Sequence, residues 1–103
     1  MNRPIIWSEA SRKDLLKIKD FYNERNKTNT YSKKLIRVFR RSAKFISKFP
    51  YNSFETEDSN IRGFHILDYT IYYEIFKTQI IILTVWDTRR SPDILKYKLH
   101  TDS

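Results

Sequence analysis

The side chains with the greatest chemical potential lie in the second half of the chain. They comprise arginines, histidines, a tyrosine and a lysine, namely Arg62, His65, Arg89, Arg90, Tyr97, Lys98 and His100. Cleavage of RNA through its 2′-hydroxyl needs a base, a proton source and cations around the phosphate, and it needs no metal. These residues could supply all three components if the fold brings them together.

Each of these residues also has a plainer structural interpretation. Arg89 could be a strand-end charge that pairs with Asp87 or Asp93. Arg62 could be an exposed charge on a strand edge, which sheets use against aggregation. His65 has apolar neighbours, where a histidine is more often a hydrogen-bonded structural residue, although an imidazole can change its charge near neutral pH.

Several other classes of site are excluded by composition. The chain has no cysteine, so disulfides and thiolate metal sites are excluded. No histidine or acidic residues have metal-ligand spacing, and a single glycine, Gly63, excludes a glycine-rich phosphate loop. We therefore expect neither a metal nor a cofactor. The longest apolar run is far shorter than the roughly 20 residues of a membrane helix, and no signal peptide is evident, so we expect a cytoplasmic protein.

Positive charge is concentrated in the first half of the chain. Residues 1–50 contain 14 Lys or Arg and 4 Asp or Glu, residues 51–103 contain 6 and 8, and the net charge is +8. The positive electrostatic field of the first half suits a polyanion or an acidic protein partner. A solvated, lysine-rich helix face that promotes solubility explains the same charge.

A short strand and a first helix are expected near the N-terminus. The run Pro4 to Trp7 is typical of a strand, and Ser8 can cap a helix that fades near residues 23–25. Residues at helical spacing form the buried face of this helix: Ser11, Leu15, Ile18 and Tyr22.

A second helix is expected from about Tyr31 to Phe49, and Pro50 would end it. Basic side chains cover most of this helix, so its apolar stripe must pack on a sheet to hold it in place. The stripe comprises Leu35, Val38, Phe39, Ser42, Ile46 and Phe49. The residues that could cap the helix are Thr28, Thr30 and Ser32.

Residues 61–90 have the composition of three antiparallel strands, separated by polar breaks at Asp68 and at 77–79. Alternating residues of the middle run should face one side: Tyr69, Ile71, Tyr73 and Ile75. The last run, 80–86, is apolar on both faces and should be the most buried strand. The polar segment from Asp87 to Pro92 would then be held by a rigid strand and still meet solvent, as binding and catalytic residues often do.

The remaining segments complete a single domain over residues 1–103. Residues 51–60 lack periodicity and are expected to form a loop, residues 94–99 could form a short strand or helical turn, and residues 100–103 should be frayed. The expected order is β-α-α-β-β-β. It gives a two-layer α+β domain in which a helical hairpin packs on a mainly antiparallel sheet.

Three features resemble the RelE/ParE superfamily of bacterial type II toxins. The opening, Ile5 to Ser8 with Ser11 and then Asp14-Leu15, is similar to the family's strand-Ser-x-x-Ala-x-x-Asp-Leu start, with serine in the alanine position. The run Tyr72-Tyr73-Glu74-Ile75 is similar to the family's aromatic third strand. The run Val85 to Asp93 is similar to its closing signature of an aromatic, Gly or Asp, Arg, Asp or Asn, and Pro. The resemblance covers about residues 4–95.

The resemblance implies a toxin that a cognate antitoxin silences. RelE-like members cut mRNA on the ribosome and ParE-like members poison DNA gyrase, and the shared fold does not decide between these targets. Our first hypothesis is the ribosome-dependent nuclease. Arg89 matches the arginine that RelE-like nucleases place on the scissile phosphate, Arg62 falls where they carry basic residues, and Tyr97 falls where they supply an aromatic group. His65 is the fourth catalytic candidate. Contacts to nucleic acid would come from Arg37, Arg41, Lys44, Arg90 and Lys98.

One departure from the RelE-like nucleases favours other functions. Those enzymes carry an arginine on the third strand, just before the aromatic pair, where this chain has Thr70. The set of cations that binds the phosphate would therefore lack one arginine, unless Arg62 or Arg90 takes its place. The long helical hairpin is also closer to the ParE type. The alternatives are a gyrase inhibitor without catalytic residues and a remnant whose main activity is antitoxin binding.

Overall fold

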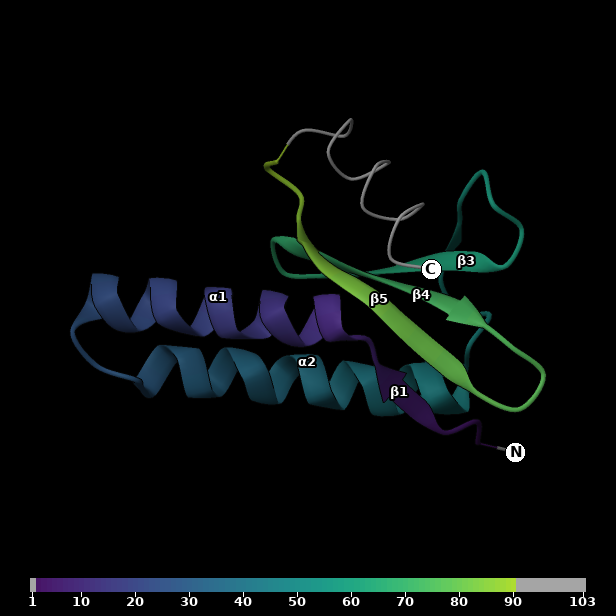
Figure 1. The fold of residues 1–103 in the computed structure, drawn as a ribbon, viewed down its shortest axis with the longest axis horizontal. Helices are drawn as coiled ribbons and strands as arrows, with labels where there is room; N and C mark the ends of the chain where they lie inside the picture. Colours follow the sequence, from purple (N-terminus) through teal and green to yellow (C-terminus); the bar gives the residue numbers. More distant parts are fainter. Residues whose placement is uncertain (1, 91–103) are drawn as a thin grey trace.

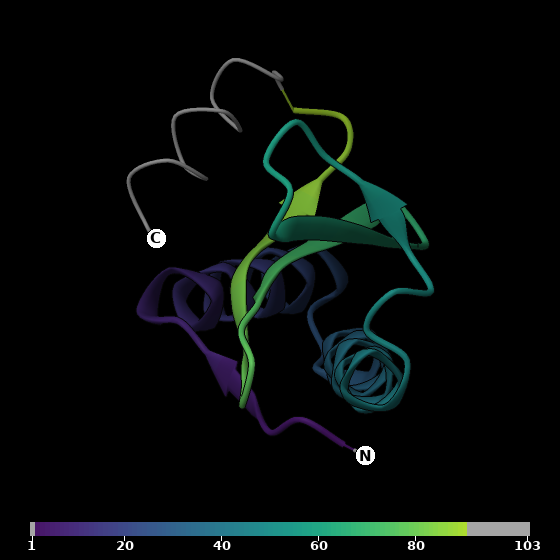
Figure 2. The same cartoon turned by 90° about the vertical axis from the view of Figure 1, so that its right-hand side faces the viewer.

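The structure, a computed structural model, describes residues 2–90, which form two helices and a five-stranded sheet (Figure 1). The elements in chain order are β1 (Ile5–Trp7), α1 (Glu9–Asn26), α2 (Thr30–Lys48), β2 (Phe54–Glu55), β3 (Ile61–Ile66), β4 (Tyr69–Ile75) and β5 (Ile80–Asp87). Both helices pack against the sheet, and the turned view shows α2 nearly end-on, with α1 passing behind β5 (Figure 2). This arrangement confirms the expected two-layer α+β fold. Neither helix is both long and apolar enough to cross a membrane.

The sheet is built around the meander that the sequence predicted. Its strand order is β1-β5-β4-β3-β2, and every neighbouring pair is antiparallel except β1 and β5, which are parallel. The polar breaks at Asp68 and 77–79 form the turns of the meander. Between Tyr72 and Tyr73 the pairing with β5 shifts by one residue, and Leu83 is the extra residue on β5. Such a bulge bends the strand and increases its twist.

The core lies between α2 and the middle of the sheet. Ile71 and Tyr73 on β4 are fully buried, as is Phe39 on α2, whose ring meets Tyr69 edge-on at 5.2 Å. Seven of the eight residues from Ile80 to Asp87 are apolar or threonine, and six of these eight are buried, so β5 is indeed the most buried strand. Phe49 was predicted to continue the apolar stripe of α2 but is 51% exposed, because the helix ends at Lys48 and the chain turns away.

Two local expectations about the connections are wrong. The N-cap residue of α2 is Asn29, not one of the three predicted residues, and its side chain makes no capping hydrogen bond. The hydroxyl of Thr28 accepts the N–H of Thr30, the first residue of the helix. Residues 51–60 are not wholly a loop, because Phe54 and Glu55 pair with β3 as the edge strand β2. Both residues of β2 are exposed, so the alternation that reveals a half-buried strand is missing.

A polar seam joins α1 to β5. Ser8 caps α1 by accepting the N–H of Ser11 at 3.0 Å, and its hydroxyl donates to the carbonyl of Leu83 at 3.1 Å. One turn further on, the buried carboxylate of Asp14 accepts the Thr84 hydroxyl at 2.6 Å and the Val85 N–H at 3.0 Å. Since β1 ends opposite Ile82, this carboxylate satisfies a backbone N–H of β5, that of Val85, beyond the end of β1. The seam therefore fixes α1 against the end of β5.

Candidate functional site

The end of β5 holds Arg89 in a bidentate ion pair. Asp87 accepts Arg89 Nε at 2.9 Å and Nη2 at 2.7 Å, and its Oδ1 also accepts the Arg89 backbone N–H at 2.9 Å. These hydrogen bonds hold the pKa of the Asp87 carboxyl below its usual range. The Arg89 side chain remains 60% exposed. Asp87, one of the two acids that the sequence offered as partners, contacts Arg89, and the other, Asp93, lies outside the described residues.

The residues around this pair are also fixed. Thr88 donates its N–H and its hydroxyl to the carbonyl of Asp68 in the β3–β4 turn, at 3.0 and 2.9 Å. The guanidinium of Arg90 stacks over the ring of Trp86 at 4.8 Å, a favourable cation–π contact. Two adjacent arginines are thus held by different partners at the end of the most buried strand.

Replacing Asp87 with asparagine should make stability at the end of β5 less sensitive to acid. The folded-state pKa of Asp87 is lowered, so its contribution is present above the unfolded value of about 3.9 and is lost as pH falls through the folded value. Urea unfolding of both proteins from about pH 7 to pH 2 would test this. The free energy of unfolding of the wild type should exceed that of the variant at pH 7, and the difference should disappear at the acid end. A difference in the free energy of unfolding that stays constant across that range would exclude the Asp87–Arg89 ion pair as the cause of the difference.

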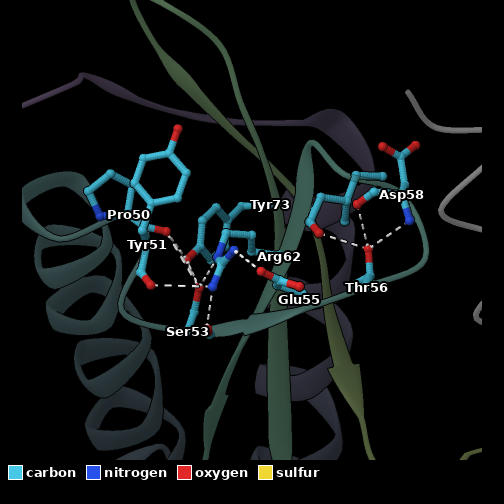
Figure 3. A network of polar contacts seen from close by, with 9 residues as sticks. Pro50, Tyr51, Ser53, Glu55, Thr56, Asp58, Arg62 and Tyr73 are labelled. Atoms are coloured by element: carbon cyan, nitrogen blue, oxygen red, sulfur yellow. Dashed lines mark hydrogen bonds and ion pairs between the residues drawn. The ribbon is translucent and has the colours of Figure 1, made fainter.

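Arg62 is held by the loop that follows α2 (Figure 3). Its Nε donates to Ser53 Oγ at 2.9 Å, and its Nη2 donates to the carbonyls of Ser53 at 2.6 Å and Tyr51 at 3.3 Å. Glu55 lies 3.7 Å from the guanidinium, the Tyr51 ring lies 5.6 Å away, and the side chain is only 13% exposed. The hydroxyl of Tyr73 joins the network at 2.6 Å from Ser53 Oγ. Arg62 therefore anchors the loop to the sheet.

The catalytic candidates on the sheet do not converge. Arg62 and His65 are three residues apart on β3, so their side chains point to opposite faces. Arg62 lies opposite Tyr73 on the helix-covered face, whereas His65 lies opposite Thr70 and its Nδ1 is 3.3 Å from the Thr70 hydroxyl. Tyr97 and Lys98, together with His100, lie outside the described residues.

Arg62 is also distant from Arg89 along the sheet. Tyr73 faces Arg62 across the strand pair, and Tyr69 faces Asp87. Tyr69 and Tyr73 are four residues apart on β4, which corresponds to about 13 Å. The two arginines that were predicted to bind phosphate therefore lie at different positions along the strands. Each is paired with an acid or carbonyl of its own.

A small cleft opens between α1 and the end of β5. It has a volume of about 180 Å³ and includes Arg89 and Arg90 in its wall. One of its lining residues is Tyr69, and the pKa of the Tyr69 hydroxyl is raised by burial and then by its contact with Tyr22. The other lining residues come from α1 and β5: Asp14, Lys17, Ile18, Phe21, Val85 and Asp87.

A larger groove of about 550 Å³ runs between α1 and α2. Apolar side chains of Leu15, Leu16 and Ile36 line it together with Ser32. Its remaining lining residues are all basic: Arg12, Lys19, Lys33, Arg37 and Arg40. Arg37, which was predicted to contact nucleic acid, thus lines this groove. Lys44, which was predicted to do the same, lines a separate groove of about 570 Å³ beside β1. Arg41 is exposed on α2.

Sequence reasoning missed that Asp14 is buried and that Lys17 and Phe21 line one cleft. Asp14 was noted only as part of a motif, although an acid in the apolar spacing of a helix indicates a buried partner. Lys17 and Phe21 are exposed and one turn apart, which is common on any helix, so only the position of β5 reveals that they share a cleft.

Comparison with known proteins gives a consistent result. The family profile of the ParE toxin of the type II toxin–antitoxin system parDE matches residues 5–92. Among solved structures, the chromosomal ParDE toxin–antitoxin system from P. aeruginosa contains a chain of similar fold, with a TM-score of 0.71 and 15% sequence identity. That match covers 82% of this chain and 95% of the other. The comparison with curated proteins finds no match.

Proposed function

Because the chain belongs to the ParE toxin family of type II toxin–antitoxin systems, we propose that it arrests growth by binding DNA gyrase. Membership of this family implies a cognate antitoxin as a partner. Family membership is the observation that carries the proposal, since ParE-like toxins, unlike RelE-like ones, inhibit gyrase through surface contacts. No catalytic residue is needed for such a mechanism.

The arrangement of the nuclease candidates supports binding over catalysis. Metal-free cleavage of RNA needs a base within hydrogen-bond reach of the 2′-hydroxyl, together with cations on the same phosphate. Here His65 and Arg62 point to opposite faces of the sheet, and Arg62 is engaged by Ser53 and Tyr51. Thr70 is buried at the position where RelE-like nucleases carry an arginine.

Expression in bacteria without an antitoxin distinguishes the two mechanisms. A gyrase inhibitor should arrest growth and relax plasmid DNA, because gyrase maintains negative supercoiling, while the 5′ ends of abundant mRNAs remain unchanged. A ribosome-dependent nuclease should instead create new 5′ ends within coding regions before plasmid topology changes. Primer extension and plasmid topology from the same cultures, sampled within minutes of induction, would separate these outcomes. New 5′ ends with normal supercoiling would overturn the gyrase proposal.

The proposed site for the antitoxin is the groove between α1 and α2. Its apolar floor and five basic side chains suit an amphipathic segment that has acidic residues beside its apolar ones. Such a segment can fold as it binds, since isolated antitoxin tails of this composition lack enough apolar residues to form a core. Burial of the floor would supply most of the affinity, and the charges would guide the segment into register.

Reversing two charges at the groove should weaken antitoxin binding. Changing Arg37 and Arg40 together to glutamate replaces attraction with repulsion, and we expect the antitoxin Kd to rise about tenfold or more at low salt. The effect should shrink as salt rises, because exposed charges are screened. Calorimetry at two ionic strengths would measure it. The matched control is the double change of Lys34 and Arg41 to glutamate, which alters exposed α2 charges that do not line the groove. Equal losses in both variants would remove the groove from the binding site.

A further inference from the structure

Helix α1 separates two distinct depressions on the surface. One side of α1 contributes Arg12, Leu15, Leu16 and Lys19 to the groove shared with α2. Another side contributes Asp14, Lys17, Ile18 and Phe21 to the small cleft beside β5. The two sets share no residue. A ligand in the groove would therefore leave the walls of the cleft available to a second partner.

The cleft has an exposed aromatic side chain that the fold does not require. Phe21 is 55% exposed and lies outside the buried core, and its ring meets Tyr22 edge-on at 4.9 Å. Large apolar side chains that remain exposed beside charged groups are frequent at the centres of protein interfaces, where aromatic residues and arginine are enriched. Phe21 is placed to make such a contact.

The wall of the cleft includes the cationic side chains of Lys17 and Arg89. Arg89 has five N–H donors, and Asp87 accepts from only its Nε and Nη2 in the side-chain pair. The carboxylate thus fixes the plane of the guanidinium, which also interacts with the side chain of Tyr22 on α1, and the Arg89 side chain is still 60% exposed. Lys17 is exposed on the α1 wall of the same cleft. An arginine that is already held in this way loses little freedom when it binds a second carboxylate.

We propose that this cleft binds the protein that the toxin inhibits, through an acidic side chain that pairs with Lys17 and Arg89 and an adjacent apolar side chain that packs on Phe21. The inference rests on the proposed function, because it assigns the contact surface for the target. The volume of about 180 Å³ lies below the ~300 Å³ at the lower end of small-molecule sites, so it suits side chains that project from a protein surface.

The test is the double variant Lys17→Glu with Phe21→Gln. We expect the purified variant to need at least about tenfold more protein than wild type for the same inhibition of gyrase supercoiling, and to arrest growth correspondingly poorly. Its melting temperature and its antitoxin Kd should remain close to wild type, because neither residue is buried and neither lines the groove. The control is Lys34→Glu with Phe76→Gln, which makes the same types of change at exposed positions outside the cleft.

The outcomes separate this inference from the proposed function. If wild-type toxin inhibits gyrase and only the cleft variant fails, both are supported. If wild-type toxin arrests growth without inhibiting gyrase, and the cleft variant no longer arrests growth, gyrase is excluded and the cleft remains the contact for another protein target. A folded cleft variant that is as toxic as wild type overturns the inference. Loss of binding to an RNA or DNA oligonucleotide, in parallel with loss of toxicity, would also overturn it in favour of a nucleic-acid site.

Discussion

Replacing Asp14 with alanine is expected to lower the free energy of unfolding by about 2–4 kcal/mol, since each buried donor left without a partner costs about 1–3 kcal/mol. The donors are the hydroxyl of Thr84 and the N–H of Val85, and both bind the same Asp14 oxygen. Without the carboxylate, two of the hydrogen bonds that join α1 to β5 would be lost, while those of Ser8 would remain. In a protein of 103 residues, each kcal/mol should lower the Tm by roughly 4–8 °C.

Chemical denaturation of the variant beside Asp20→Ala would measure this effect. Asp20 is an exposed acid on the same helix, so its removal should change stability by less than about 0.5 kcal/mol. A similar small change for Asp14→Ala would mean that the seam contributes little to the fold. The asparagine variant should fall between wild type and alanine, because its amide oxygen can still accept one hydrogen bond.

Replacing Arg62 with alanine is expected to destabilise the protein by about 1–3 kcal/mol, because hydrogen bonds from a charged donor are stronger than neutral ones. The side chain donates to Ser53 and Tyr51 and is largely buried, so its loss would release the loop after α2. Lysine should restore little of this stability, since an ammonium cannot reproduce the fork of a guanidinium.

The same variant tests the nuclease hypothesis. If Arg62 anchors the loop, toxicity per folded molecule should persist in Arg62→Ala at a temperature where the protein remains folded. If Arg62 binds a scissile phosphate, toxicity should fall by roughly 100- to 1000-fold with no loss of stability. Thermal melts and growth arrest at matched soluble levels would distinguish these results. Arg25→Ala, which removes an exposed arginine from α1, is the control.

The sequence predicted the principal elements because hydrophobic periodicity marked them. The alternation of Tyr69, Ile71 and Tyr73, and the unbroken run of β5, identified the sheet and its most buried strand. The edge strand β2 was not predicted, because two exposed residues carry no periodicity. The parallel pairing of β1 with β5 depends on how the helices return the chain, which local patterns do not encode.

The candidate site was predicted less completely, because it depends on which side chains meet. Asp87 was one of two possible partners for Arg89, and its contact with Arg89 depends on the geometry of the turn after β5, which the sequence pattern does not give. Arg62 was interpreted as an edge charge or a phosphate ligand, whereas it binds a loop nine residues earlier in the chain. Phe21 and Lys17 acquire significance only when β5 is placed beside α1.

The proposal that gyrase is the target is tested most directly by titrating the purified toxin into a supercoiling assay with purified gyrase. We expect inhibition that increases with toxin concentration and that is relieved when the cognate antitoxin is added. Unimpaired supercoiling, at a concentration of folded toxin that saturates its antitoxin, would contradict the account.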